Sequence, residues 1–136
     1  MIVKQLSVFL ENKQGRLCAA VDVLAKNDIN ISALSLADTS DFGILRLMVS
    51  EVDRAVQVLR DASFAVMLTD VICLNVPNVS GALSEILESL AANDIFIEYM
   101  YAFSEGDNAN VVIRPTDIDR CVSILTAGNI TLLQVL

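Results

Sequence analysis

An internal repeat constrains the fold of this chain more than any other feature of its sequence. Comparing the sequence with itself at an offset of 66 residues gives a match that needs no gap. Gly15 corresponds to Gly81, and Asn27-Asp28-Ile29 corresponds to Asn93-Asp94-Ile95. The remaining matches pair Leu17 with Leu83, Leu24-Ala25 with Leu90-Ala91, Ile31 with Ile97, Asp53-Arg54 with Asp119-Arg120, Val56 with Val122 and Leu59 with Leu125. A match at one fixed offset indicates that a single structural unit has been duplicated.

The hydrophobic pattern of the first copy predicts the order strand, helix, strand, strand, helix, strand. Apolar residues at helical spacing predict a helix over 16–26, which Asn27-Asp28 ends. A second helix follows Ser50, which we expect to be its N-cap because Asp53 stands three residues later. Alternating apolar residues predict strands over 4–10, 29–36, 43–49 and 64–68.

The second copy repeats this order. We expect its second helix to be capped by Thr116, with Asp119 three residues on. The predicted helices are 82–92 and 117–126, and the predicted strands are 71–76, 95–103, 109–113 and 131–135. Only Thr69-Asp70 lies between the two copies, which places the domain boundaries at 1–69 and 70–136.

This element order predicts an α+β fold, with two tandem ferredoxin-like βαββαβ units. Each unit is expected to form an antiparallel four-stranded sheet with both helices on one face. A unit of about 65 residues buries only about 60% of the surface that its unfolded chain exposes, so it gains stability from a partner. The apolar fraction of 54% is high enough to supply such interfaces, and we expect a homodimer.

The charge and the apolar runs of the chain limit the kinds of partner that it is expected to bind. The formal net charge is −8, and the nine lysines and arginines are scattered without a basic run. An acidic chain repels phosphate backbones, so nucleic acid is not expected as a partner. No stretch approaches the roughly 20 apolar residues of a membrane span. The first residues read as a strand rather than a signal peptide, which predicts a cytoplasmic protein with no membrane partner.

The residue types that most often carry catalysis and metal binding are scarce. The chain has no histidine, which is the commonest general base near neutral pH. Its three cysteines, Cys18, Cys73 and Cys121, are far apart and each falls at an apolar position, so we interpret them as small buried hydrophobic residues. The sequence therefore predicts no catalytic residue, no metal site, no cofactor and no enzyme activity.

Both copies place a glycine between the first strand and the first helix. The first turn reads Asn12-Lys13-Gln14-Gly15-Arg16-Leu17, and the second reads Asn78-Val79-Ser80-Gly81-Ala82-Leu83. A glycine lets the backbone approach a ligand closely, and the free N–H groups of a helix start favour an anion such as a carboxylate. An asparagine amide can accept a hydrogen bond from an ammonium group or donate one to a carboxylate. The turns fit an amino acid ligand, although they also fit a role confined to turning and capping the chain.

These residues resemble the ACT domain, a regulatory module of amino-acid metabolism. The resemblance rests on the Asn-x-x-Gly-x-Leu turn and on Asn27-Asp28-Ile29-Asn30-Ile31. Each of the two copies resembles one ACT domain, so that together they cover nearly the whole chain. The second copy departs from the pattern, with Phe96 in place of Asn30. The resemblance implies that a free amino acid binds where ACT domains pair, and that a metabolic enzyme or regulator is the partner.

The resemblance also implies the ligand-binding residues, which are the glycine turn and the start of the second strand in each copy. In the first copy these are Asn12, Gln14, Gly15, Arg16, Leu17, Asn30, Ile31 and Ser32. In the second copy they are Asn78, Ser80, Gly81, Ala82, Leu83, Ile97, Glu98 and Tyr99. Two alternatives remain open from the residues alone: a structural or dimerisation module without a ligand, and a small ferredoxin-like hydrolase. Binding of free amino acids separates the first of these from a sensor.

Overall fold

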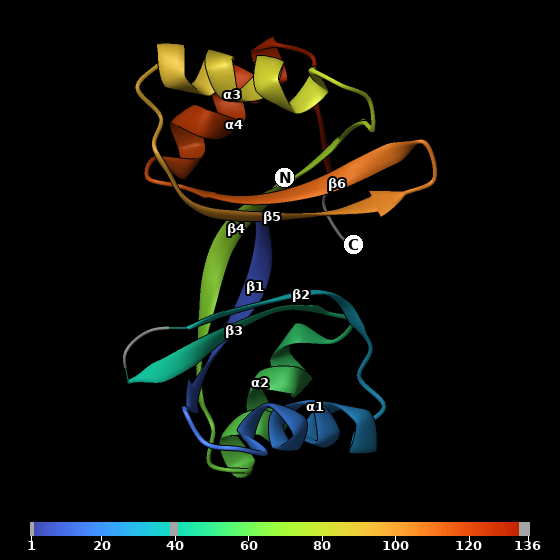
Figure 1. Cartoon of the computed structure of the whole chain (residues 1–136), viewed down its shortest axis with the longest axis vertical. Coiled ribbons are helices and arrows are strands. Elements are labelled where there is room, and N and C mark those ends of the chain that lie inside the picture. Colours follow the sequence, from blue (N-terminus) through green and yellow to red (C-terminus); the bar gives the residue numbers. More distant parts are fainter. Residues whose placement is uncertain (1, 39–40, 134–136) are drawn as a thin grey trace. The chain divides into compact units, whose positions relative to one another are not determined.

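A computed structural model describes residues 2–38 and 41–133 of the chain (Figure 1). The chain divides into two compact units. The first unit spans Lys4–Thr69, and the second comprises the described residues from Asp70 onward together with Ile2 and Val3. Strand β4 (Ala65–Pro77) is unbroken, so its first residues belong to the first unit and its later residues to the second. The sequence had predicted two strands here, separated by Thr69-Asp70.

The first unit is a βαββαβ fold. Its elements are β1 (Ile2–Glu11), α1 (Arg16–Lys26), β2 (Ile31–Asp38), β3 (Phe42–Val49), α2 (Val52–Asp61) and the start of β4. The strands lie in the order β2-β3-β1-β4, and both helices cover one face of the sheet (Figure 1). Alternate residues of β1, namely Leu6, Val8 and Leu10, turn toward these helices and are buried with Leu24 and Leu59. The predicted fold class is confirmed for this unit.

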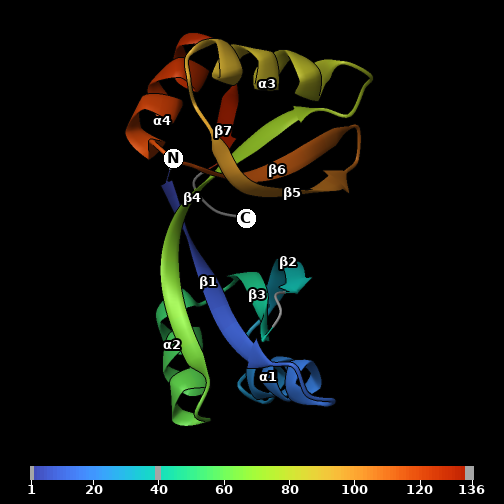
Figure 2. The ribbon, with the colours of Figure 1, turned by 60° about the vertical axis from the view of Figure 1, so that its left-hand side comes forward.

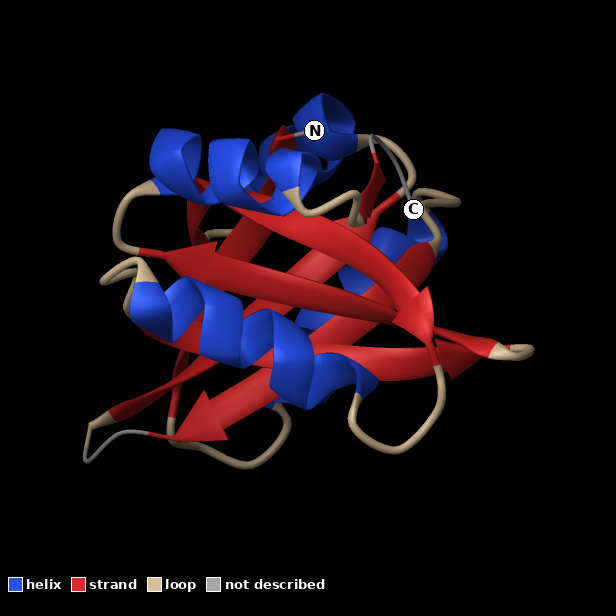
Figure 3. Cartoon of the chain, turned by 90° about the horizontal axis from the view of Figure 1, so that it is seen from above, coloured by secondary structure: helices blue, strands red, loops and turns tan. Residues whose placement is uncertain are grey.

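The second unit has the same fold. Its elements are the end of β4, α3 (Ala82–Ala92), β5 (Ile97–Glu105), β6 (Asn108–Pro115), α4 (Ile118–Ala127) and β7 (Thr131–Leu133). The strand order is β7-β4-β6-β5, and α3 and α4 lie on one face of this sheet (Figure 2). Ile72, Leu74, Leu90 and Leu125 form the centre of its core. The loops that join the elements are short (tan in Figure 3).

The duplication extends to the pairing of the strands. Leu6 pairs with Leu47 in the first unit, and the equivalent residues Ile72 and Ile113 pair in the second. The register shifts at equivalent places, between Ile31 and Ala33 and between Ile97 and Tyr99. The offset found in the sequence is therefore also the offset of the backbone hydrogen bonding.

All four helices end in the same way. The residue after the helix cap is left-handed without being a glycine: Asp28 (φ 57°), Ser63 (φ 69°), Asp94 (φ 58°) and Asn129 (φ 59°). The N–H of the following residue then donates to the helix five residues back, as from Ile29 to the Leu24 carbonyl at 3.0 Å. This is the Schellman motif, which satisfies the last carbonyls of a helix and returns an apolar residue to the core. It gives a physical reason for the repeated Asn-Asp-Ile sequence.

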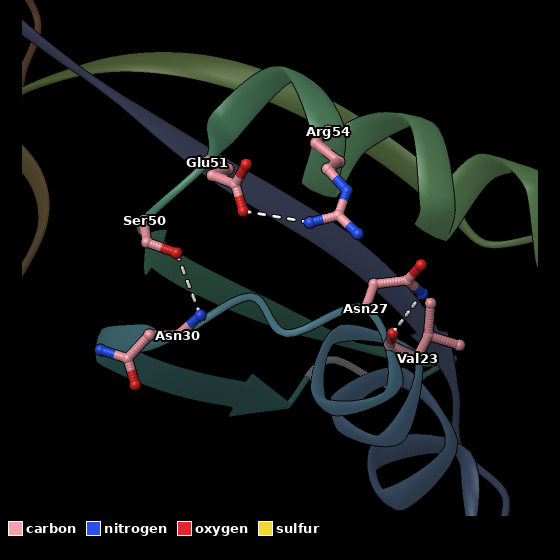
Figure 4. A network of polar contacts seen from close by, with 6 residues as sticks. All are labelled: Val23, Asn27, Asn30, Ser50, Glu51 and Arg54. Atoms are coloured by element: carbon pink, nitrogen blue, oxygen red, sulfur yellow. Dashed lines mark hydrogen bonds and ion pairs between the residues drawn. The ribbon is translucent and has the colours of Figure 1, made fainter.

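The start of α2 differs from the prediction. Glu51, not Ser50, is the N-cap residue, and its carboxylate pairs with Arg54 at 3.1 Å (Figure 4). The Ser50 hydroxyl instead accepts a hydrogen bond from the N–H of Asn30 at 3.0 Å. The Ser50 side chain is thus hydrogen-bonded to the residue before β2, and the sequence around Ser50 does not reveal this contact. The prediction of Ser50 as the cap was wrong.

The start of α4 needs a similar correction. Asp117, not Thr116, is the N-cap, because its side chain accepts from the N–H of Arg120 at 3.1 Å. Other boundaries moved by a residue or two, and both middle strands begin two residues later than predicted. The predicted turn at 38–41 and the predicted strand 131–135 extend beyond the described residues at 39–40 and 134–135.

The cysteines divide into two environments. Cys73 and Cys121 are buried, as predicted, whereas Cys18 on α1 is exposed and corrects the prediction. Burial raises the pKa of the Cys73 thiol to about 11, with a further contribution from the charge of Glu105. Burial likewise raises the pKa of Cys121 to about 11, and Asp117 adds to the effect. These two thiols are un-ionised near neutral pH, as expected of side chains that only fill space.

Candidate functional site

The two glycine turns adopt the same backbone conformation. Gly15 has φ 89° and ψ −10°, and Gly81 has φ 89° and ψ −17°. Each is the N-cap of its helix and provides no side-chain acceptor, so the first helical N–H groups receive no side-chain cap. A Cβ at either glycine would meet nothing within 4 Å, so only the left-handed conformation requires glycine here. Both turns thus present a bare helix start.

A hollow of about 500 Å³ lies beside the turn of the first unit. We call it the turn hollow. It is lined by Leu10, Glu11, Asn12, Lys13, Gln14, Arg16, Leu17, Leu36, Ala37, Asp38 and Gly43. Four of the predicted site residues are therefore brought together, namely Asn12, Gln14, Arg16 and Leu17. Gly15 does not line the hollow, although it sets the path of the turn.

The opposite wall of the turn hollow was not predicted from the sequence. It is formed by the end of β2, with Leu36 and Asp38, and by Gly43 at the start of β3. A Cβ on Gly43 would lie 3.4 Å from Leu36 Cδ1 and 3.9 Å from Asn12 Oδ1. A Cβ at Gly43 would thus make only ordinary van der Waals contacts, and Gly43 and Asn12 lie side by side in the lining of the hollow.

The other predicted residues of the first unit lie far from the turn. Asn30, Ile31 and Ser32 stand at the start of β2, where Ile31 pairs with Val49. The turn adjoins the other end of the same strand pair, where Asp38 pairs with Gly43. Six residues of β3 separate these ends, or roughly 20 Å at about 3.4 Å per residue. A single unit therefore does not bring the start of β2 to its own glycine turn.

Arg16 has an unusual environment for a charged residue. Its guanidinium lies over the ring of Phe64, 4.5 Å from the ring centre, which is a cation–π contact. Its Nε is buried and has no hydrogen-bond partner in the described part of the chain. Around this pair lies a smaller space of about 260 Å³, the Arg16 hollow, lined by Phe9, Leu10, Glu11, Arg16, Phe42, Ser63, Phe64 and Ala65. Arg16 thus borders both hollows.

The other charges of this turn are paired. Lys13 Nζ lies 2.8 Å from a carboxylate oxygen of Glu11, and both side chains are exposed. The hydrogen bond and the charge of Lys13 lower the pKa of Glu11, and Arg16 adds a smaller lowering effect. Arg16 acts on Glu11 only at longer range, since no described carboxylate lies within 4.0 Å of its nitrogens. Together Glu11, Lys13 and Arg16 give the turn a net charge of one positive unit.

In the second unit a hollow lies beside the glycine turn and the start of α3. This α3 hollow has a volume of about 520 Å³. It is lined by Asn75, Val76, Pro77, Val79, Ser80, Gly81, Ala82, Glu85, Ile86, Ser89, Ile124, Leu125, Gly128, Asn129, Ile130 and Thr131. Of the predicted residues, Ser80, Gly81 and Ala82 are among them. The end of α4 and the start of β7 form the opposite wall, which sequence reasoning missed.

The remaining predicted residues of the second unit are occupied elsewhere. The N–H of Asn78 donates to the Asp107 carbonyl at 2.9 Å, and its side chain donates to the Ser104 hydroxyl at 3.4 Å. Leu83 packs against the core. Ile97, Glu98 and Tyr99 stand at the far end of β5, where Glu98 pairs with Arg114 at 3.7 Å. The turn and the strand start are again separated within one unit.

The α3 hollow occupies the place in the second unit that the Arg16 hollow occupies in the first. Seven of the eight residues that line the Arg16 hollow have counterparts in the α3 hollow at the offset of 66, for example Leu10 with Val76, and Phe42 is the exception. Two of the corresponding side chains are smaller in the second unit, since Arg16 corresponds to Ala82 and Phe64 to Ile130. A guanidinium stacked on a ring occupies the space that these smaller side chains leave open. This pair of replacements is visible in the sequence once the copies are aligned.

Within residues 2–38 and 41–133, no three cysteine, aspartate or glutamate side chains gather closely enough to hold a metal ion. The helices of the described segments are all too short or too polar to cross a membrane.

Comparison with protein families gives a match over almost the whole chain. The family described as ACT domain pair matches residues 1–134. No protein with curated annotation matches the sequence. Among solved structures, protein BT0572 from Bacteroides thetaiotaomicron is 52% identical, with 98% of this chain and 92% of that chain covered and a TM-score of 0.94.

More distant structures share the fold. The regulatory subunit of aspartate kinase from Thermus thermophilus, in its ligand-free form, has a TM-score of 0.69 at 14% identity, covering 93% of this chain and 90% of that chain. The corresponding subunit from Thermus flavus has a TM-score of 0.65 at 13% identity, with coverages of 91% and 88%. Both are regulatory subunits rather than catalytic ones. At this identity they establish the arrangement of the strands and helices.

Proposed function

Because the chain belongs to the ACT domain pair family, we propose that it is a non-catalytic regulatory protein that binds a free amino acid. The ligand is held beside the glycine turn of the first unit, in the turn hollow. Binding stabilises one arrangement of paired ACT domains and so shifts the population toward it. The two domains of this proposal are 1–69 and 70–136.

The observation that carries this proposal is the charge of Arg16. The side chain borders the turn hollow, its Nε has no hydrogen-bond partner in the described part of the chain, and no described carboxylate lies within 4.0 Å of its nitrogens. Such a guanidinium suits a carboxylate ligand, because its fork of N–H groups matches the two carboxylate oxygens. The α-carboxylate common to all amino acids supplies this group.

The rest of the turn hollow complements a zwitterion. Helix α1 begins at Gly15 with no side-chain cap and no acidic residue in its first turn, so its N–H groups and dipole favour the ligand carboxylate. The opposite wall carries Asp38, whose carboxylate can accept from the ligand ammonium group. At about 500 Å³, the hollow is within the usual size range of small-molecule sites.

The proposed site is completed where two ACT domains pair. Asn30, Ile31 and Ser32 lie too far from the turn of their own unit, so they and a turn contact one ligand only across such an interface. We propose a homodimer. Support comes from exposed apolar side chains on β2, where Leu34 is 54% and Leu36 is 50% exposed. Sedimentation of the wild-type chain and of Leu34→Glu measures this directly.

The proposed setting is the cytoplasm, with a metabolic enzyme or regulator as the partner. All three cysteines are free thiols, which suits a reducing compartment. The aspartate kinase subunits with this fold are by name the regulatory parts of an enzyme of amino-acid metabolism. Co-purification of the native chain with its partner tests this part of the proposal.

A thermal-shift screen of the twenty standard amino acids tests the function. An amino acid present at about 100 times its Kd adds about 2.7 kcal/mol to the free energy of unfolding, so its melting temperature rises by several degrees. No shift with any amino acid contradicts the proposal and favours a scaffold without a ligand.

A pair of variants tests the position of the site. Arg16→Met keeps an unbranched apolar stem over Phe64 but removes the charge, so affinity for the amino acid found in the screen falls about tenfold or more. Arg54→Met removes an arginine that pairs with Glu51 on α2, and affinity stays at the wild-type value. Unchanged affinity in Arg16→Met places the site away from the turn hollow, whether or not an amino acid binds.

A further inference from the structure

We propose that the α3 hollow is a second site, which binds a small organic cation with an apolar body and a protonated amino group. The residues that line it come from the second unit, namely the end of β4, the turn that follows it, α3, the end of α4 and the start of β7. It is chemically distinct from the turn hollow, where Arg16 favours a carboxylate. The proposal therefore goes beyond amino acid binding in the first unit.

The charge of the lining points to a cation. Glu85 carries the only charged side chain among the residues that line the hollow. It lies in the first turn of α3 and is exposed, so its carboxylate is accessible to a ligand in the hollow. The lining contains no lysine or arginine to hold an anion. A protonated amine can form a charge-assisted hydrogen bond with this carboxylate.

The field of the second unit acts in the same direction. Residues 70–136 contain nine acidic residues and two arginines, whereas residues 1–69 contain eight acidic and seven basic residues. Of the two arginines, Arg114 is held at the other end of the unit by the Asp70 carbonyl and by Glu98. Summed charges of one sign attract counter-ions over the whole surface of a unit. This unit therefore raises the local concentration of cations and repels anions.

The walls favour an organic cation over a metal ion. Val76, Ile86, Ile124, Leu125 and Ile130 form an apolar part of the lining, beside the neutral polar residues Asn75, Ser80, Ser89, Asn129 and Thr131. Calcium and magnesium are usually held by several oxygen ligands that include more than one charged group, and Glu85 is the one carboxylate in this lining. An apolar body on these side chains gains about 25 cal/mol for each Å² of apolar surface removed from water.

In the first unit, side chains of the chain itself occupy the equivalent place. There the chain supplies a cation stacked on an aromatic ring, with Arg16 4.5 Å from the centre of Phe64. The second unit has Ala82 and Ile130 at the equivalent positions, so it supplies neither the charge nor the ring. A ligand that carries a ring and an ammonium group restores both. We therefore choose 2-phenylethylamine as the probe.

The test is a titration of the isotope-labelled full chain, followed by two-dimensional amide NMR spectra. The probes are 2-phenylethylamine, the neutral 2-phenylethanol and the anionic 3-phenylpropanoate. We expect the amine to shift the amides of Gly81, Glu85 and Ile130 and to bind about fourfold more tightly than the alcohol, the effect of one exposed ion pair. The anion binds more weakly than either. An anion that binds as tightly as the amine, or amine-induced shifts spread over both units, overturns the proposal.

Two variants make the test specific. Glu85→Gln keeps the shape of the side chain, so it removes the preference for the amine and leaves the alcohol affinity unchanged. Ala82→Arg combined with Ile130→Phe rebuilds the stacked pair in the second unit, so no probe binds there. A preference that persists in Glu85→Gln overturns the proposal, and this variant decides the matter if the double variant does not fold. Amino acid binding is read at the amides of the first unit, so each site succeeds or fails independently.

Discussion

The two units have the same backbone but differ in the size of the hollows between their side chains. Their strand registers, helix ends and glycine turns correspond residue by residue. At one equivalent place, however, Arg16 and Phe64 border a hollow of about 260 Å³ in the first unit, whereas Ala82 and Ile130 border one of about 520 Å³ in the second. The path of the backbone depends on residues in special conformations, such as the left-handed residues at the helix ends, and these recur in both units. Side chains at the rim of the core can change in pairs without disturbing them.

The charge difference follows the same division. The first unit keeps a basic turn with Lys13 and Arg16, and the second has Glu85 in the first turn of α3. Because the backbone at the two glycines is the same, the units differ here in the charge of their side chains and not in the path of the turn. Under the two binding proposals above, this difference gives a duplicated unit a second specificity while its fold is kept.

The largest expected difference between the units lies in their thiols. Cys18 of the first unit is exposed, whereas Cys73 and Cys121 of the second are buried with pKa values of about 11. At pH 8 only about one in a thousand of the buried thiols is ionised, and reagent reaches them only after opening of the structure. Labelling with a thiol reagent should therefore be at least about a thousandfold faster at Cys18, measured by mass spectrometry of the peptides.

The variant Cys18→Ser is the control, since it removes the fast phase and leaves the slow labelling in place. Two fast phases in the wild-type chain would show that the second unit opens readily, and would break the structural equivalence of the two cores.

Equivalent core leucines should contribute equally. Leu24 and Leu90 are 0% and 1% exposed and stand at the same place in the two helices. Replacing either by alanine leaves a cavity and should lower the free energy of unfolding by about 3 kcal/mol, as measured by urea denaturation. A difference of more than about 1 kcal/mol between the two variants would mean that the cores are not packed alike.

Converting the first unit into the second should have a smaller cost. The double variant Arg16→Ala/Phe64→Ile removes the cation–π contact and part of a buried ring, so we expect a loss of about 2 kcal/mol in urea denaturation. The reverse change, Ala82→Arg/Ile130→Phe, should alter the stability by less than about 1 kcal/mol because it fills an existing space. Equal losses in both directions would argue against the equivalence of the two hollows.

The smallest expected effect concerns the helix ends. Ser63 is left-handed, and glycine adopts this conformation without strain, so Ser63→Gly should raise the free energy of unfolding by about 0.7 kcal/mol. Asn129→Gly, at the equivalent place, should gain less because asparagine tolerates this region. The control Ser123→Gly, within α4, should lose about 0.5 kcal/mol. Thermal unfolding of the three variants measures these changes. A higher stability of Ser123→Gly would contradict the assignment of strain to the helix ends.

The sequence predicted the fold well because the deciding contacts are periodic or local. Helices 16–26 and 82–92 were predicted with their observed bounds, since apolar spacing and the Asn-Asp pair mark them. The caps were predicted less well. Ser50 has the residue type of a cap, but its hydroxyl accepts a hydrogen bond from the N–H of Asn30, which is twenty positions earlier. A local pattern does not contain such a contact.

The candidate site was predicted only on the side that is local in sequence. Asn12, Gln14, Arg16 and Leu17 belong to one turn, so the pattern brings them together. Asp38 and Gly43 come from β2 and β3, and the pairing of β2 with β3 and of β3 with β1 is needed to place them there. The stacking of Arg16 on Phe64 is also non-local, yet the joint change of both residues in the second copy was available as a sign of it.

The four identical helix ends bear on the order in which the chain folds. Each end is closed by a hydrogen bond between residues five positions apart, such as Phe64 to Leu59, and short loops close at the lowest entropic cost. The sheet pairs, such as Leu6 with Leu47, join distant residues and form more slowly. Helix ends that form early direct an apolar residue such as Phe64 or Ile130 back toward its sheet before that sheet exists. The chain thereby carries four local guides to a topology that is otherwise built from long-range contacts.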